Sequence, residues 1–319
     1  MPAQPPHRAA AWLSRHPAPP VPQSRAAGRL SRHRTQRVPA WSYFIGSAIF
    51  HYLGPAFAVL LFARLAPPGV ACLRIWSAGL VFALWRRPWR ALARLDRGGR
   101  RTVLAWGVVL AAMNSSFYLA IARLPLGTVA AIEFLPVIAL AALGARTGRN
   151  LAALAFAAAG VYVLTDARLA GEPLGFVFAF ANAVLFAAYI VIAHRAARQL
   201  PNGIDGLAVA MLAACLFVVP LGSWLATPAF TDPVSLGAGI GVGISSSVIP
   251  YICDQLAMAR LARSTYALLL ALLPATATVI GVIVLRELPT PAEIAGVALV
   301  VVAVALHHEP SPPAGPSHR

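Results

Sequence analysis

The sequence contains no lysine, and it has few charged residues of either sign. Only 11% of its 319 residues are charged, all 26 basic residues are arginine, and aspartate and glutamate together number 10. The three cysteines, Cys72, Cys215 and Cys253, show no ligand spacing, so they predict neither a disulfide framework nor a metal site. No G-x-x-x-x-G-K-[ST] segment occurs, which excludes a P-loop nucleotide site, and we expect no cofactor.

The chain is rich in long apolar segments. Hydrophobic residues make up 59% of the chain, and they fall in blocks of roughly 14 to 25 residues, as membrane-spanning helices require. The sequence therefore predicts an all-α membrane protein with ten transmembrane helices. The expected spans are Trp41–Phe62, Val70–Trp85, Val103–Ile121, Leu126–Leu143, Leu151–Leu164, Leu174–Ala193, Leu207–Ala226, Leu236–Met258, Tyr266–Leu285 and Ile294–Leu306.

The net charge of +16 is distributed asymmetrically. With the N-terminus in the cytoplasm, 21 of the 26 arginines fall in cytoplasmic segments and 4 in external ones, while Arg74 lies within a span. This is a strong positive-inside signal, and it predicts that both termini are cytoplasmic. The N-terminal tail and the loop Arg86–Arg101 hold seven arginines each, and we expect both to bind anionic lipid head groups. Nucleic acid is not expected as a partner, because no aromatic-interleaved basic fold accompanies the charge.

The two ends of the chain have little apolar content. Residues 1–40 are rich in Pro, Arg, Ala and Ser, so they cannot bury enough surface to fold alone. No apolar core with a cleavage site precedes the first span, which argues against a cleaved secretory signal. Residues 308–319 contain four prolines. We predict disorder for both tails.

A short internal repeat divides the remaining chain into halves, 41–165 and 166–307. The segment Ala120–Thr128 recurs as Ala257–Thr265, with five of nine positions identical at an offset of 137. Pro136 of the first copy corresponds, after a shift of one residue, to Pro274 of the second. The first copy joins spans three and four and the second joins spans eight and nine. Because a shift of five spans is odd, the halves must insert with opposite orientations, the inverted-repeat plan of many secondary transporters.

Four glycines in the eighth expected span form two overlapping G-x-x-x-G pairs. Gly237, Gly239, Gly241 and Gly243 present two faces about 200° apart at helical periodicity. Small residues let helices approach closely, so we expect this helix to be packed on both sides, although chance occurrence in an Ala- and Gly-rich sequence is the alternative. Pro250 is expected to bend the same helix.

Glu133 lies near the middle of the apolar segment Pro125–Gly144. An ionisable side chain at the centre of a membrane helix costs roughly 2.5 to 3.5 kcal/mol, and such residues usually face a bundle interior, a cavity or a partner charge. Glu133 is therefore the leading candidate for a transport or proton pathway. Arg74, near the outer end of its span, either pairs with Glu133 or extends to a lipid head group.

Other polar residues inside the expected spans have two interpretations each. His51 either relays protons or bonds a backbone carbonyl. Asn114 and Asn182 more often join helices than bind ligands. Asp254, nearer the cytoplasmic end of its span, has either a capping or a pathway role. The candidate pathway residues are His51, Arg74, Asn114, Tyr118, Glu133, Tyr251 and Asp254.

Several motifs resemble the drug/metabolite transporter superfamily, in particular its EamA family and the threonine/homoserine exporter branch. The most specific segment is Phe117–Pro136, with a Pro-Leu-Gly turn followed by Glu-Phe and a Pro. The second half carries Ile249–Leu261, Leu272–Ala275 and Arg286–Gly296, which are similar to further family motifs. This resemblance implies a ten-span inner-membrane protein built from two inverted five-helix repeats. It also implies export of amino acids, drugs or metabolites.

Two positions depart from the family pattern. The family often has Glu immediately before the Pro of span nine, where this chain has Leu273, and its first copy usually has Gly where this chain has Leu135. The second departure agrees with the one-residue shift in the repeat. Because of these departures, the local helix geometry near Glu133 can differ from that of the family, and the choice of substrate can differ with it.

The sequence as a whole predicts a secondary transporter that exports amino acids or similar small metabolites across a bacterial plasma membrane. Glu133 would bind a proton or the substrate amine, and Arg74 or a helix N-terminus would bind its carboxylate. The first alternative is a multidrug exporter, in which Tyr118, Phe134 and Tyr251 matter more than charge. A membrane-embedded enzyme or a scaffold is less favoured, since no catalytic clustering appears. A homodimer remains open.

Reporter fusions test the predicted orientation. Single fusions after Arg168 and after Ala229 should report the outside, and fusions after Arg97 and Gln199 should report the inside, because the arginines partition in that sense. Alkaline phosphatase and fluorescent-protein activity provide the readouts. A reversed result at both inside positions would show the topology to be wrong and would leave the repeat intact.

Overall fold

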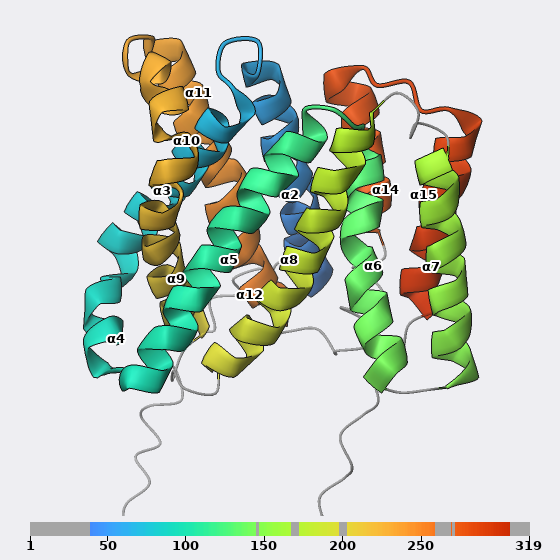
Figure 1. Cartoon of the computed structure of the whole chain (residues 1–319), viewed down its shortest axis with the longest axis horizontal. Coiled ribbons are helices and arrows are strands. Elements are labelled where there is room, and N and C mark those ends of the chain that lie inside the picture. Colours follow the sequence, from blue (N-terminus) through green and yellow to red (C-terminus); the bar gives the residue numbers. More distant parts are fainter. Residues whose placement is uncertain are drawn as a thin grey trace, which may run out of the picture. The chain divides into compact units, whose positions relative to one another are not determined.

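The computed structural model describes residues 39–144, 147–166, 172–197, 203–258, 269 and 272–306. These ranges are built from helices, and no strand occurs within them (Figure 1). The all-helical class predicted from the sequence is therefore confirmed. The tails expected to be disordered lie outside this part, up to residue 38 and from residue 307, as does most of the second repeat copy.

The described residues of the first half of the chain form six helices. In order they are α2 (Ala40–Leu61), α3 (Pro67–Arg86), the short α4 (Pro88–Arg94), α5 (Arg97–Ile121), α6 (Leu126–Gly144) and α7 (Gly148–Asp166). Proline opens both α3 and α4, because the first turn of a helix has no use for the N–H that proline lacks. The side chain of Asp96 begins α5 by accepting a hydrogen bond from the Gly99 N–H at 2.8 Å.

The second half is more interrupted. Its elements are α8 (Pro173–Ala197), α9 (Gly203–Phe217), α10 (Val219–Ala226), the 3₁₀ turn η2 (Thr227–Phe230), α11 (Pro233–Gly243), the π-helix η3 (Ile244–Val248), α12 (Ile249–Met258), α14 (Leu273–Ile280), the π-helix η4 (Gly281–Leu285) and α15 (Pro291–Leu306). The seventh expected span, Leu207–Ala226, is broken, because the helical segments Ile204–Phe217 and Gly222–Phe230 meet at an angle of 88°. Pro220 lies at this break, where it removes a backbone donor.

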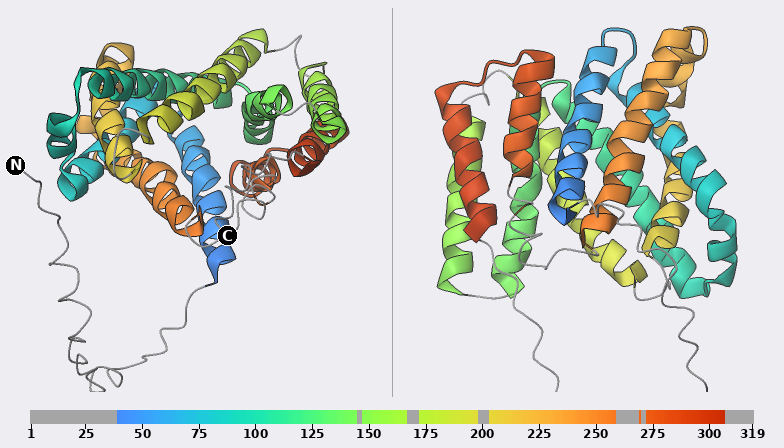
Figure 2. Two further views of the ribbon diagram at one scale, coloured as in Figure 1. Left: turned by 90° about the horizontal axis from the view of Figure 1, so that it is seen from below. Right: turned by 180° about the vertical axis from the view of Figure 1, so that it is seen from behind.

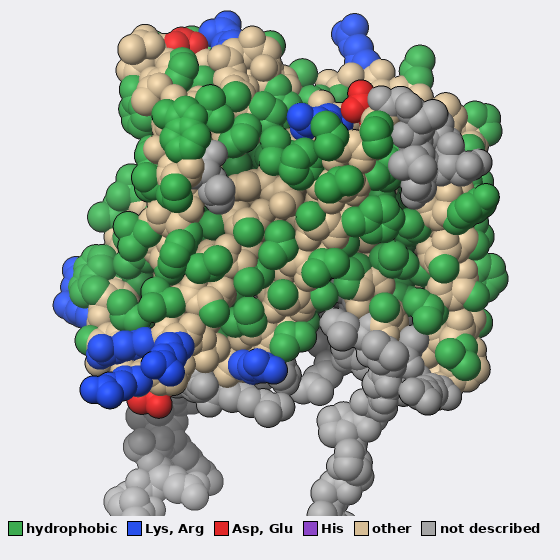
Figure 3. Space-filling model, in the orientation of Figure 1, with side chains coloured by type: hydrophobic (Ala, Val, Ile, Leu, Met, Phe, Trp, Pro, Cys, Tyr) green, Lys and Arg blue, Asp and Glu red, His purple; other side chains and the backbone are tan. Residues whose placement is uncertain are grey.

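Within the described ranges, five helices are long and apolar enough to cross a bilayer. They are Trp41–Leu61, Pro67–Arg86, Arg97–Ile121, Pro173–Ala193 and Pro233–Cys253, and the bent α9–α10 pair gives a sixth if it counts as one span. Shorter apolar helices in the described part are Leu126–Pro136, Gly148–Leu164, Leu273–Leu285 and Pro291–Leu306. Hydrophobic side chains cover most of the visible face between the two ends of these helices (Figure 3). Such a surface is that of a membrane-embedded protein.

Helices of the first half pack mainly against helices of the second. α5 packs against α8 and α9, α2 against η3 and α12, α6 against α14, and α7 against α15, as the views in Figures 1 and 2 agree. α7 and α15 come together at Gly160 and Gly296. A Cβ atom on either glycine would stand 2.7 or 2.9 Å from the carbonyl oxygen of the other. Only glycine permits this approach.

Arginines gather at one end of the helices. Arg87, with a left-handed φ of 50°, joins α3 to α4. Arg86 donates two hydrogen bonds to Asp205 at the start of α9, at 2.9 and 2.6 Å. The exposed arginines of this segment are Arg87, Arg90, Arg94, Arg97, Arg100 and Arg101. Figure 3 shows their side chains around α4.

The opposite end carries an ion pair. Arg64, just after α2, donates to the Asp232 carboxylate at 3.0 Å. The same carboxylate caps α11 by accepting from Val234 N–H and Ser235 N–H. Hydrogen bonding from the Ser235 hydroxyl, with a further contribution from Arg64, holds the pKa of Asp232 below its usual value.

The four glycines of the eighth span are packed on one face only, so the expectation of packing on both sides is wrong. A Cβ on Gly239 would stand 2.8 Å from the Leu73 side chain, and one on Gly243 would stand 2.7 Å from the Arg74 carbonyl oxygen. No atom of the described residues lies within 4 Å of a Cβ built on Gly237 or Gly241. α3 therefore occupies the first face. The second borders a shallow groove between α2 and α11.

Alanine substitutions should separate the two faces. Gly243→Ala should cost about 1 to 3 kcal/mol of stability, because the added methyl group overlaps the α3 backbone. Gly241→Ala is the matched control and should be neutral or stabilising by up to about 1 kcal/mol. Melting temperatures of the purified proteins in detergent measure both. Equal losses would contradict the one-sided packing.

Candidate functional site

Arg74 is buried within the bundle and bonded to the π-helix η3. Its side chain is only 8% exposed. Nε donates to the Ser247 hydroxyl and Nη2 donates to the Ser246 carbonyl oxygen, both at 3.1 Å. Its side chain therefore does not extend to a head group, and it forms no ion pair with Glu133 in the described part of the chain. Neither of the two arrangements considered from the sequence is the one observed.

The local sequence explains why η3 can receive this cation. A π-helix widens the turn and disturbs the regular ladder of hydrogen bonds, and Pro250, the second residue after η3, cannot donate to that ladder. Ser245 and Ser246 turn their own hydroxyls back to the Val242 carbonyl, at 3.2 and 2.5 Å. Gly54 of α2 packs directly on Ser246, where a Cβ would overlap. Pro250, where the sequence predicts a bend, thus lies close to the Arg74 site.

Tyr118 of α5 completes the surroundings of Arg74. The guanidinium carbon lies 5.5 Å from the centre of the Tyr118 ring, a distance suited to a cation–π interaction. Phe62 packs edge-on against the same ring at 6.1 Å. The Tyr118 hydroxyl lies beside Ser246 and Arg74 but completes no well-aligned hydrogen bond within the described residues.

Glu133 of α6 is 7% exposed and is held by an amide. The Asn182 side chain of α8 donates to its Oε1 at 3.2 Å. Tyr52 of α2 and Arg74 both lie within electrostatic range of the carboxylate. The Tyr52 hydroxyl and the Asn182 Oδ1 are buried and have no hydrogen-bond partner in the ranges that the structure describes. Such atoms indicate a place for water or a polar ligand.

An aromatic cluster lies next to Glu133 along the chain. Phe134 packs edge-on against Phe186 at 6.3 Å, and Phe186 stacks on Tyr189 at 6.1 Å. Trp106 lies 5.7 Å from Tyr189. This cluster joins α5, α6 and α8 and gives the region around Glu133 an apolar, aromatic component.

The remaining sequence-predicted residues differ in their placement. Asn114 donates to the Leu110 carbonyl of its own helix at 2.8 Å, which is a structural bond. His51 lies on α2 beside Tyr52, within electrostatic range of Arg74. Tyr251 is half-buried on α12, and the side chain of Asp254 lies outside the described residues.

Four contributors to this region were not among the candidate pathway residues predicted from the sequence, although Asn182 was recognised as a polar residue within a span. Ser246 and Ser247 bind Arg74, Asn182 binds Glu133, and Tyr52 lies close to Glu133. The serine run directly before Ile249-Pro250 was the available signal for the first two. Within the described ranges no group of His, Cys, Asp and Glu residues could hold a metal ion. The site can instead bind opposite charges at two separate positions.

Comparison with known proteins identifies the family. Residues 173–307 match the EamA-like transporter family. The threonine/homoserine exporter RhtA of Escherichia coli (strain K12) is 30% identical over 256 residues, which are 78% of this chain and 84% of that protein. RhtA of Salmonella typhimurium (strain LT2) matches with the same identity and coverage. The chain belongs to the EamA-like transporter family. The resemblance to its threonine/homoserine exporter branch is confirmed.

A solved structure shows the same fold at lower similarity. One protein crystal structure superposes with a TM-score of 0.56 at 20% sequence identity, over 84% of this chain and 95% of that chain. At this identity the likeness shows the fold alone.

The Asn182–Glu133 bond can be tested by a double-mutant cycle. Asn182→Leu should cost about 1 to 3 kcal/mol, because it removes the donor to a buried carboxylate, and much less in a Glu133→Leu background, in which the acceptor is already gone. Asn114→Leu is the control, since it bonds only its own helix. Melting temperatures in detergent give the four stabilities. Strict additivity of Asn182→Leu and Glu133→Leu would contradict the bond.

Proposed function

We propose that this protein exports threonine, homoserine or a closely related small amino acid across the inner membrane of a bacterium. The observation that carries the proposal is a pair of buried opposite charges, each hydrogen-bonded to uncharged protein groups instead of to the other charge. Arg74 is held by η3 and Glu133 by Asn182, so neither charge neutralises the other by direct contact. The similarity to the threonine/homoserine exporter RhtA supports the choice of substrate.

The two charged groups suit a zwitterion. The Arg74 Nη1 and the Glu133 Oε2 make no hydrogen bond within the described part of the chain. A substrate carboxylate would bind the first and a substrate ammonium the second, as charge-assisted hydrogen bonds. The side-chain hydroxyl of threonine or homoserine would then bond the Tyr52 hydroxyl or the Asn182 Oδ1, which lack partners among the described residues.

Glu133 also provides a route to gradient coupling. A proton and a substrate ammonium would compete for the same carboxylate, because each requires its negative charge. Inward movement of a proton on Glu133 would therefore alternate with outward movement of the amino acid. This exchange uses Glu133, a buried carboxylate at the proposed substrate position, and it needs no nucleotide.

The proposed topology is ten spans in two inverted five-helix repeats, with both termini in the cytoplasm. The packing supports it, because a contact between two helices recurs between their proposed equivalents in the other half. The contact of α5 with α8 corresponds to that of α12 with α2, and the contact of α6 with α8 corresponds to that of α14 with α2. The reciprocal approach of Gly160 and Gly296 joins the proposed equivalents α7 and α15. The exposed arginines around α4 would face anionic head groups of the cytoplasmic leaflet.

A multidrug exporter is the second candidate. The cluster of Phe134, Phe186, Tyr189 and Trp106 supports it, because aromatic surfaces bind varied apolar compounds. The buried pair of opposite charges favours the zwitterion. Competition of threonine efflux by a lipophilic cation would distinguish the two candidates.

Charge removal at Glu133 and Arg74 tests the proposed mechanism. Glu133→Gln and Arg74→Gln should each lower efflux of radiolabelled L-threonine from proteoliposomes by about tenfold or more, because each removes a charge-assisted bond to the substrate. Glu172 is an exposed carboxylate directly before α8. The variant Glu172→Gln is therefore the control and should retain wild-type efflux. Protein amounts are matched by immunoblot. Wild-type flux in Glu133→Gln would remove this carboxylate from the mechanism.

A further inference from the structure

A shallow groove runs between α2 and α11. It has a volume of about 450 Å³, and its lining is mostly apolar and includes Phe57 and Leu60 of α2 and Val234 of α11. These three large hydrophobic side chains are exposed. In the view from behind in Figure 2, α2 (blue) and the α11–α12 segment (orange) lie side by side in front. The groove therefore opens on a side of the molecule that would contact the hydrocarbon of the bilayer.

The length of the groove matches one leaflet of a bilayer. The groove extends along α11 and η3 from Val234, next to the Asp232 cap, to Ser245. These 11 residues correspond to about 16 Å of helix. Half of the hydrocarbon core of a bilayer is about 15 Å thick. An acyl chain of the outer leaflet therefore fits along the groove in the proposed orientation.

An exposed ion pair lies at the outer end of the groove. Arg64 lines the groove and donates from Nη1 to the Asp232 Oδ2 at 3.0 Å, and the two side chains are 58% and 36% exposed. This is the only hydrogen bond of the Arg64 guanidinium within the described residues, so most of its five donors remain available. In the same part of the chain the Asp232 Oδ1 accepts only from the Val234 N–H, at 3.1 Å. Both charges can therefore bind a further group.

The two charges define the head group that fits. Because lipid tails are as apolar as the groove, an acyl chain alone gives little preference for one lipid over another. A phosphate would accept charge-assisted hydrogen bonds from Arg64, and a primary ammonium would donate them to Asp232. The quaternary ammonium of phosphatidylcholine has no N–H to donate, and phosphatidylglycerol has no cation for the carboxylate. Phosphatidylethanolamine has both of the required groups.

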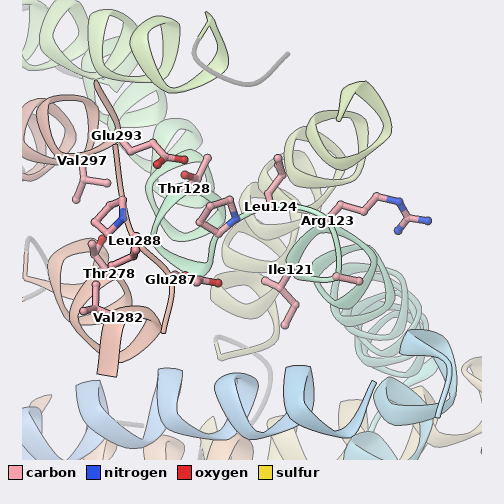
Figure 4. A pocket seen from close by; sticks show the side chains of 14 residues that line it. Ile121, Arg123, Leu124, Thr128, Thr278, Val282, Glu287, Leu288, Glu293 and Val297 are labelled. Carbon is pink, nitrogen blue, oxygen red and sulfur yellow. The ribbon is translucent and has the colours of Figure 1, made fainter. Parts of the chain in front are cut away.

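The pocket shown in Figure 4 differs from this groove. It has a volume of about 340 Å³ and lies between the α5–α6 turn and the segment that joins η4 to α15. Its two carboxylates bind helix ends, because Glu287 accepts from the Leu126 N–H at 3.2 Å and Glu293 accepts from the Thr290 N–H at 2.8 Å. These bonds give the pocket a role in joining α6 to the second half of the chain.

We propose that the groove between α2 and α11 binds phosphatidylethanolamine of the outer leaflet. One acyl chain lies between the two helices, the phosphate binds Arg64 and the ammonium binds Asp232. The inner end of the groove is Ser245 of η3, and the next two residues of η3 bind Arg74. The bound acyl chain thus packs against the element that holds the buried cation. The proposal goes beyond the export function and does not depend on the transported substrate.

Native mass spectrometry of the purified full-length protein tests the lipid site. The protein in detergent is titrated with phosphatidylethanolamine, phosphatidylcholine and phosphatidylglycerol that carry the same acyl chains. The wild type should bind phosphatidylethanolamine at least about fivefold more tightly than either other lipid, because each of these lacks one charge-assisted contact. Equal affinities for the three lipids would show annular lipid only and would overturn the proposal.

Two substitutions each remove one charge of the ion pair. Arg64→Gln should weaken phosphatidylethanolamine binding about fivefold or more. Asp232→Asn should remove the preference over phosphatidylcholine, while asparagine still caps α11. Glu172→Gln, at an exposed carboxylate directly before α8, is the control and should bind like the wild type. Unchanged preferences in both groove variants would overturn the proposal, and Arg64→Gln decides alone if Asp232→Asn does not fold.

Gly241 and Gly237 provide a matched pair for the acyl chain. Gly241 lines the groove and Gly237 lies outside its lining, although a Cβ on either glycine meets no described atom within 4 Å. Gly241→Leu should fill the groove and abolish the preference for phosphatidylethanolamine, whereas Gly237→Leu should retain it. Melting temperatures in detergent check that both variants fold. A dimer that Gly241→Leu dissociates would place a second copy of the chain in the groove and overturn the proposal.

Discussion

The hydrogen bonds between Arg74 and the π-helix η3 determine how the buried polar groups of this protein are arranged. A guanidinium at this depth has to be solvated by the protein, and Ser246 and Ser247 supply the oxygen atoms. That contact requires α3 and η3 to lie close together, which Gly243 permits, and it requires α2 to pack on the other side of η3, which Gly54 permits. The helices around Arg74 are therefore positioned by a buried cation as well as by apolar packing.

The same arrangement explains how Glu133 remains available for chemistry. If Arg74 and Glu133 formed a direct ion pair, the pair would satisfy itself and a substrate would have to break it. In the structure Asn182 holds one carboxylate oxygen, and Arg74 is held by neutral oxygen atoms. The two charges stay complementary to a zwitterion and in electrostatic range of each other. Neutral partners of this kind stabilise a charge without cancelling it.

Local sequence signals predicted the class of the protein and its principal charged residues, while the partners of those residues depended on the tertiary structure. Glu133 and Arg74 were identified because a charge in an apolar segment is visible in one dimension. Asn182 and Ser247 lie 49 and 173 residues away from the groups they bind, so no local pattern could connect them. The glycine pattern of α11 has two equivalent faces in the sequence, and only the position of α3 shows that one face is packed. The bend at Pro220 likewise occurs within an uninterrupted apolar run.

The capping of α6 by Glu287 has a consequence for the order of assembly during synthesis. The carboxylate that binds the Leu126 N–H belongs to a residue 161 positions later, which a ribosome adding 5 to 20 residues per second reaches after about 8 to 30 s. During that interval the first turn of α6 lacks this acceptor, although the helix that carries Glu133 has already been made. The first half of the protein therefore cannot reach its final structure alone. The cap on the helix that carries Glu133 therefore forms only after most of the second half of the chain has been synthesised.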